Sequence, residues 1–168
     1  MPVRPLTELA AGSRVLVDSN IFIYAADRKS DECVEFLERC GREELHGITT
    51  LEILTEVCHR LMLEDAFANG MVQRATAAQL RRKRQFIPQL RTYWPAVIRP
   101  LDMNLLLLQL DETRFRDAQV IRERYGLLTN DSLILAAVDS YGITNLATRD
   151  SDFDEVPWLT VYKPGDIT

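Results

Sequence analysis

Several acidic residues stand where a parallel sheet would place its chemistry. Asp18 directly follows the apolar run RVLV, and Asp150 and Asp152 follow the run ITNLAT. If both runs are parallel strands, these acids lie at strand carboxyl ends, beside the crevice in which open α/β sheets bind ligands. Each acid also has a purely structural explanation. Asp18, in the run Asp-Ser-Asn, fits a helix N-cap, and the two later aspartates fit a turn.

Two further acids belong to predicted helices. Asp131 opens a helix expected over about 131–141, where an acid complements the helix dipole. Glu56 lies within a helix expected over about 51–63, off its apolar stripe, and taken alone it fits a solvated surface position. Together, however, these acids can converge on one crevice. Clustered carboxylates raise one another's pKa and are stabilised by hard cations with oxygen ligands, so the pattern predicts a site for hard divalent cations.

Other catalytic and cofactor-binding patterns are absent from the sequence. The two His and three Cys residues have no zinc-site spacing. There is no glycine-rich GxGxxG or GxxxxGK[ST] loop for a nucleotide and no GxSxG motif for a serine nucleophile. The acids therefore carry the functional prediction.

Short β-rich runs alternate with longer helical stretches, which predicts one domain with helices on both faces of a parallel sheet. We expect helix breaks at Asn69-Gly70 and at Pro88. The strands are expected at 14–18, 47–49, 96–99, 143–148 and 159–162. The helices are expected at 20–27, 31–40, 51–63, one or two between 66 and 94, then 103–115, 117–125 and 131–141.

The distribution of charge is uneven. Residues 66–101 contain seven Lys or Arg and no acid, so they carry +7 and leave −12 for the rest of a chain whose net charge is −5. Such a segment beside an acidic remainder suits the binding of a phosphate backbone near a metal site, although a solvated helix face explains it equally well. The residues that we expect to make these phosphate contacts are Arg81, Arg82, Lys83 and Arg84.

The spacing of the cysteines and the length of the apolar runs predict where in the cell the protein is found. Three cysteines without a CxxC pair favour a reducing compartment. The first 14 residues lack the apolar core of a signal peptide, and the longest apolar run, Leu105 to Leu108, cannot span a bilayer. We therefore expect a cytoplasmic protein with no membrane contact.

Four stretches resemble the motifs of PIN-domain ribonucleases, in the family's order. VLVDSNIFIYAAD is similar to the opening motif, TTLEILTEVCHRL to the second acidic motif and LLTNDSLILAAV to the third. ITNLATRDSDF, followed by a short strand and YKP, is similar to the closing motif. The resemblance runs from about Arg14 to Pro164 and is carried by all four motifs together; the segment from about Ala66 to Phe115 has no family signature.

The resemblance implies a three-layer α/β/α sandwich with a central parallel sheet of about five strands. It also implies a Mg²⁺- or Mn²⁺-dependent endoribonuclease that uses a metal-activated water. The four acids matching the family's metal ligands are Asp18, Glu56, Asp131 and Asp150; the accessory positions are Asn20, Thr148 and Asp152. Similarity to toxins of VapC-type toxin–antitoxin systems further implies an RNA substrate, an antitoxin partner and a homodimer.

Two alternatives remain at this stage. Phosphatases of the haloacid-dehalogenase type also place aspartates at strand ends, but they need Asp-x-Asp after the first strand, where this chain has Asp18-Ser19-Asn20. A non-catalytic module that binds RNA or a partner is the other alternative, because a fold alone does not fix a function.

The second acid of the family pattern has two possible matches, Glu52 and Glu56. Thr49-Thr50-Leu51-Glu52 fits a capping box, with Thr49 as N-cap and Glu52 bonded back to its N–H. In that arrangement Glu52 stabilises the start of the helix, and Glu56, one turn further on, is free to bind the metal. We therefore predict that Glu56 is the ligand.

Overall fold

Six parallel strands form one sheet in the order β1-β6-β5-β2-β3-β4. The structure is a computed structural model that describes residues 3–167. Its central strand, β2, has three consecutive buried residues, because a parallel sheet covered on both faces buries both sides of each strand. The strands are β1 (Arg4–Pro5), β2 (Arg14–Val17), β3 (His46–Thr50), β4 (Leu106–Leu108), β5 (Asn145–Ala147) and β6 (Thr160–Lys163).

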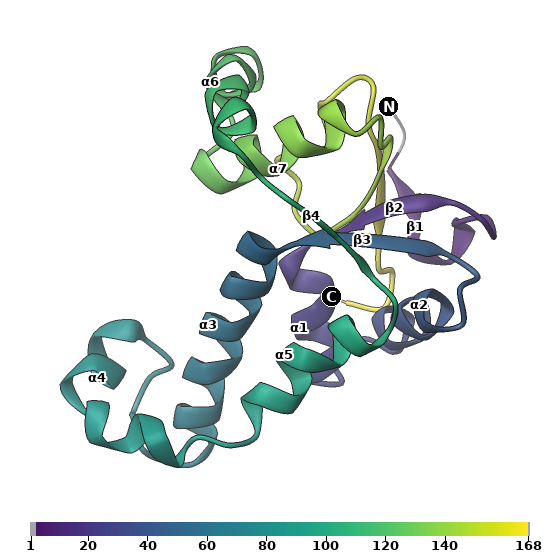
Figure 1. Cartoon of the computed structure of the whole chain (residues 1–168). Helices are drawn as coiled ribbons and strands as arrows, with labels where there is room; N and C mark the ends of the chain where they lie inside the picture. Colours follow the sequence, from purple (N-terminus) through teal and green to yellow (C-terminus); the bar gives the residue numbers. More distant parts are fainter. Residues whose placement is uncertain (1–2, 168) are drawn as a thin grey trace.

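Helices cover both faces of this sheet, as the sequence predicts for a three-layer α/β/α sandwich. In Figure 1, α6 and α7 lie on one side of the strands, and α1, α2, α3 and α5 lie on the other. The helices are α1 (Ser19–Ala26), α2 (Asp31–Gly41), α3 (Leu51–Ala68), α4 (Ala77–Arg82), α5 (Tyr93–Asp102), α6 (Glu112–Tyr125) and α7 (Thr129–Ser140), with 3-10 turns η1 (Leu6–Glu8) and η2 (Arg84–Gln89). No helix within residues 3–167 is long and apolar enough to cross a membrane.

The order of the strands creates a switch point. From β2 the chain moves outward through β3 to β4, and later it returns to the other side of β2 with β5 and β6. The carboxyl ends of β2 and β5 are therefore neighbours from which the chain departs to opposite sides. In open α/β sheets, a crevice for ligands lies at such a point.

Two sequence predictions between residues 93 and 125 are wrong. Residues 96–99 belong to helix α5, and the strand is β4, about ten positions later. The short run Ala-Val-Ile fits a buried helix as well as a strand, and the buried residues Val97 and Pro100 follow helical spacing. The helix expected at 103–115 is also wrong, because residues 106–108 form β4. The helix expected at 117–125 is confirmed but begins earlier, since α6 starts after the N-cap Asp111. The sheet also gains β1, which the sequence analysis did not predict.

A lobe projects from the sandwich, formed by the far half of α3, α4 and η2 (Figure 1). It has its own small apolar core, which includes Leu63, Leu80 and Leu90. The buried Asp65 ties the lobe together, because its carboxylate accepts hydrogen bonds from the backbone N–H groups that open α5 and from the Asn69 side chain. Helix α3 continues about five residues beyond its expected end near residue 63 and stops at the predicted break Asn69-Gly70, where Gly70 has a positive φ of 66°. Pro88 lies inside η2.

Candidate active site at the carboxyl edge of the sheet

Asp18 lies where β2 ends and α1 begins, and only 7% of it is exposed. It is the N-cap of α1, and its Oδ1 accepts a hydrogen bond of 2.7 Å from the Ser19 N–H. Its Oδ2 accepts two more, from Asn20 Nδ2 at 2.7 Å and from Thr148 Oγ1 at 2.6 Å. The structural explanation of Asp18 as a cap is therefore correct, but it accounts for only one of the three bonds.

Thr148 joins the ends of β2 and β5. Its side chain is fully buried, and its hydroxyl donates to Asp18 while accepting from Asn20 Nδ2 at 2.9 Å and from the Asp150 N–H at 3.0 Å. Asn20 Oδ1 in turn accepts a bond from the Arg149 N–H. The two accessory positions thus hold Asp18 rigidly and fix the start of the loop that carries Asp150.

The four acids that the sequence singles out line one pocket of about 220 Å³. Asp18 comes from the end of β2, Glu56 from the second turn of α3, Asp131 from the first turn of α7, and Asp150 from the loop after β5. Asn20 lines the same pocket, and Thr148 lies buried behind it. Asp152 is exposed and does not line the pocket, but its N–H bonds Asp150 Oδ1 at 2.9 Å.

The capping box predicted at the start of α3 is wrong by one residue. Thr50, not Thr49, is the N-cap, and its Oγ1 accepts from the Ile53 N–H; Thr49 is buried in β3 and bonds the Val17 carbonyl. Glu52 is therefore one position too early to close a capping box. It is exposed and does not line the acidic pocket, whereas Glu56 does.

The pocket is electrostatically unfavourable in the absence of a cation. Burial and the nearby charges of Asp150, Asp18, Asp152 and Glu56 raise the pKa of Asp131 to about 6. Burial also raises the pKa of Asp18, opposed by its hydrogen bonds from Thr148 and Ser19. A site that raises carboxylate pKa values in this way gains free energy when a cation enters.

Comparison with known proteins decides the family. A family model described as PIN domain matches residues 15–159, which is most of the chain. The chain belongs to the PIN domain family. Ribonuclease VapC2 of Methanocaldococcus jannaschii is 24% identical over 159 residues, covering 90% of this chain and 94% of that protein. Ribonuclease VapC6 of the same organism is 41% identical over 63 residues, covering 38% of this chain and only 37% of that protein.

Solved structures share the fold of this PIN domain. One is VapBC2 from Rickettsia felis bound to a DNA fragment from their promoter, with a TM-score of 0.58, 16% identity, and coverage of 89% of this chain and 98% of that one. Another is a toxin–antitoxin complex from Klebsiella pneumoniae, with a TM-score of 0.53, 19% identity, and coverage of 87% and 95%. At these identities the similarity is one of fold.

The donor atoms of the pocket suit a hard divalent cation. All four acids offer carboxylate oxygens, and Asp18 Oδ1 keeps a second lone pair beside its bond to Ser19. Within residues 3–167, however, no three His, Cys, Asp or Glu side chains are already close enough to ligate one ion. Binding a cation would therefore require carboxylate side chains to rotate inward, against the repulsion that raises the pKa of Asp131.

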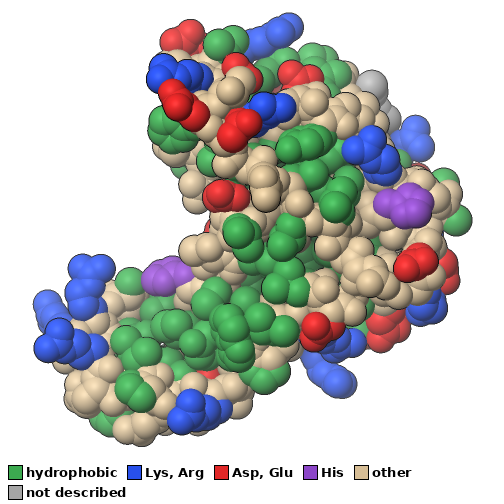
Figure 2. Space-filling view, viewed as in Figure 1, with side chains coloured by type: hydrophobic (Ala, Val, Ile, Leu, Met, Phe, Trp, Pro, Cys, Tyr) green, Lys and Arg blue, Asp and Glu red, His purple; other side chains and the backbone are tan. Residues whose placement is uncertain are grey.

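The basic segment lies away from the acids, on the lobe. Arg81 and Arg82 end α4, and both are exposed, as are Lys83 and Arg84. The Lys83 ammonium bonds the Met71 carbonyl, so part of its charge serves the lobe itself. Figure 2 shows a hollow between the α6–α7 end of this PIN domain and the lobe, with Lys and Arg side chains gathered at the lobe's far end.

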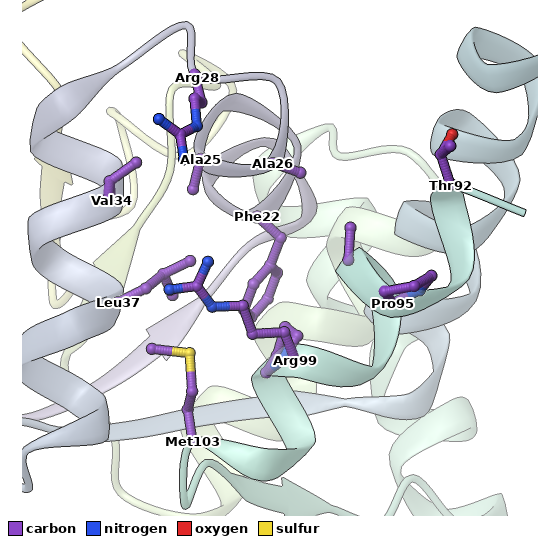
Figure 3. A pocket seen from close by; sticks show the side chains of 12 residues that line it. Phe22, Ala25, Ala26, Arg28, Val34, Leu37, Thr92, Pro95, Arg99 and Met103 are labelled. Atoms are coloured by element: carbon purple, nitrogen blue, oxygen red, sulfur yellow. The ribbon is translucent and has the colours of Figure 1, made fainter.

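A larger cavity, of about 310 Å³, lies between α1, α2 and α5. Figure 3 shows Phe22, Leu37 and Met103 lining it, together with Arg28 and Arg99. It contains no carboxylate, so it lacks ligands for a hard cation. The acidic pocket is therefore the better candidate for hydrolytic chemistry, despite its smaller size.

The sequence analysis assigned no site role to four residues that line the acidic pocket, which are Ser19, Ile23, Tyr24 and Arg60. Arg60 follows Glu56 by four residues on the same helix, so the two share a face of α3. That spacing was a usable signal for Arg60. Tyr24 lies on α1, and no pattern in the sequence relates it to α3.

Proposed function

We propose that this PIN domain is a Mg²⁺- or Mn²⁺-dependent endoribonuclease and the toxin of a toxin–antitoxin pair. The observation that carries the proposal is the pocket at the switch point, lined by Asp18, Glu56, Asp131 and Asp150 from four different elements. Support comes from two curated relatives named as ribonucleases and from two structural neighbours solved as toxin–antitoxin complexes.

The proposed chemistry is hydrolysis of an RNA phosphodiester. The cation supplies a water of lowered pKa and neutralises charge on the reacting phosphate. Asp18, Glu56, Asp131 and Asp150 would hold the cation directly or through water. The hydrogen bonds from Asn20 and Thr148 to Oδ2 orient Asp18, and the bond from Thr148 opposes the rise in the pKa of Asp18 that burial causes.

The test is RNA cleavage by purified protein, with and without Mg²⁺ or Mn²⁺. We expect cleavage with either metal and none in EDTA, because the proposed mechanism takes its nucleophile from a metal-activated water. Metal should also raise the thermal midpoint, since it binds the folded state. Undiminished cleavage in EDTA would refute the mechanism. RNA binding without cleavage under any metal would instead favour the non-catalytic alternative.

A matched pair of variants tests the ligand assignment. Glu56→Gln should abolish cleavage and keep the fold, because it removes a carboxylate charge from the pocket without changing side-chain volume. Glu52→Gln, one turn earlier on the same face, should keep most activity, because Glu52 lies outside the pocket. An inactive Glu52→Gln beside an active Glu56→Gln would reverse the assignment.

We also propose an antitoxin partner and a homodimer. The partner would be a small protein encoded beside this one, whose co-expression relieves growth arrest and suppresses cleavage. Light scattering of the purified chain measures the dimer directly. Free growth without the neighbouring gene, or a monomer at micromolar concentration, would contradict these two points separately.

A further inference from the structure

Arg60 is a cation in the lining of an otherwise acidic pocket. It lies on α3 one turn beyond Glu56, on the side that leads towards the lobe, and it is exposed. None of the ion pairs among residues 3–167 includes it. The fold therefore leaves its guanidinium available, and the planar fork of an arginine matches two oxygens of a phosphate.

Tyr24 lines the same pocket from the neighbouring helix. It lies on α1, which packs against α3, and it is half-buried. Its ring takes part in none of the aromatic or cation–π pairs in the described part of the chain. A partly exposed aromatic ring beside a phosphate-binding group is a common arrangement for an unpaired nucleotide, whose base stacks on the ring.

The charge of Arg60 offsets a repulsion between the acidic pocket and an RNA strand. RNA carries negative charge at every linkage, and the four acids of the pocket repel those linkages that are not held by the cation. A guanidinium at the rim offsets this repulsion for one adjoining linkage. The position of Arg60 also indicates on which side of the acids this linkage lies. From Glu56 through Arg60, helix α3 runs on to the lobe that carries Arg81 and Arg82.

We propose that Tyr24 and Arg60 form a binding subsite for the nucleotide next to the cleaved linkage, on the side of the lobe. Arg60 binds the phosphate of that nucleotide, and Tyr24 stacks on its base. The subsite rests on the proposed ribonuclease function and deepens it, because it requires a single-stranded substrate whose base is free to leave its neighbours.

The experiment uses four variants of the full chain: Arg60→Ala, Arg60→Lys, Tyr24→Leu and Tyr24→Phe. Arg4→Ala is the matched control, since it removes an exposed arginine from β1 at the far edge of the sheet. We measure kcat and KM on single-stranded RNA oligonucleotides. Arg60→Ala and Tyr24→Leu should each raise KM about tenfold, the scale of one lost stacking or phosphate contact, with kcat nearly unchanged. Arg60→Lys should recover part of the loss and Tyr24→Phe most of it.

Modified oligonucleotides locate the subsite. One series replaces a single linkage near the cleavage point with an uncharged methylphosphonate, and another removes a single base. The effect of Arg60→Ala should vanish for one uncharged linkage only, and that of Tyr24→Leu for one missing base in the same nucleotide. The salt dependence of binding should also become shallower by about 0.7 for Arg60→Ala.

Each outcome is decisive. If the wild type cleaves RNA and both variants match Arg4→Ala, the subsite is refuted while the ribonuclease function stands. Effects that persist on every modified oligonucleotide, or that map to nucleotides far apart, also refute it. If the wild type neither cleaves nor binds RNA with either metal, the proposed function itself has failed.

Discussion

Replacing Thr148 with valine tests whether the buried hydroxyl organises the acidic pocket. Valine has nearly the same shape, so the change removes hydrogen bonds without leaving a cavity. The Thr148 hydroxyl makes three of them, to Asp18 at 2.6 Å, to Asn20 at 2.9 Å and to the Asp150 N–H at 3.0 Å. All three are lost at once in a site that has no exposure to water.

The size of the effect follows from these bonds. A hydrogen bond to a carboxylate contributes about 1.5–3 kcal/mol and a neutral one about 1 kcal/mol. Asp18 keeps its bonds from Ser19 and Asn20, which recovers part of the sum. We therefore expect the free energy of unfolding to fall by about 3 kcal/mol. For a protein of this size, that lowers the thermal midpoint by roughly 6–12 °C.

The same change should alter activity in a defined way. The hydrogen bond from Thr148 lowers the pKa of Asp18, so its loss raises a pKa that burial already raises. The acid limb of the pH–activity profile should then move to higher pH, and half-maximal activity should need more Mg²⁺. Both follow because a protonated Asp18 is a poor metal ligand.

Urea unfolding in EDTA and cleavage at several pH values are the assays, with Thr148→Ser as control. Serine keeps the hydroxyl and loses one methyl group, so Thr148→Ser should lower the free energy of unfolding by only about 1 kcal/mol and leave the pH–activity profile unchanged. Thr148→Val within about 0.5 kcal/mol of wild type, or with an unshifted acid limb, would refute the reasoning.

Four further variants test other parts of the structure. Because the pKa of Asp131 is raised to about 6 in the folded protein, the folded state takes up a proton between pH 7 and pH 5 that the unfolded chain does not bind. The free energy of unfolding of the wild type in EDTA should therefore rise, relative to that of Asp131→Asn, as the pH falls from 7 to 5. Asp131→Asn should be the more stable protein at pH 7, and equal urea midpoints there would count against the repulsion. Arg81→Ala with Arg82→Ala should weaken RNA binding for all sequences alike and flatten its salt dependence by about 0.7 per lost contact; an unchanged slope in filter binding would leave the segment as a solvated surface. Thr50→Ala should lower the free energy of unfolding by about 1 kcal/mol, because it removes the N-cap of α3, while Glu52→Ala should lower it by less than about 0.5 kcal/mol. If urea unfolding gave the reverse order, the capping box of Thr49 and Glu52 would be correct after all.

The sequence by itself determined the elements whose signals are local. The apolar run before Asp18 predicts β2, and the acid at its end predicts both an N-cap and a site residue. Asn69-Gly70 predicts a helix break, because glycine adopts the positive φ required there, and α3 does stop at that point, although the sequence analysis expected its end near residue 63. The four acids that line the pocket were also singled out from sequence, because each follows a strand or lies on a helix near a strand end, whereas Asn20 and Thr148 were chosen by the resemblance to PIN domains.

The tertiary structure decided what depends on distant partners. Residues 96–99 form a helix because their apolar side pairs with no strand and packs against other helices, a choice that a short apolar run cannot reveal. Thr50 rather than Thr49 caps α3 because β3 pairs with β4 up to Thr50, so the strand ends one residue later than local pattern predicts. The bond from Thr148 to Asp18 spans 130 residues, and Tyr24 and Arg60 line one pocket only because α1 packs on α3. Such contacts form when the sheet brings strand ends together, which local sequence does not encode.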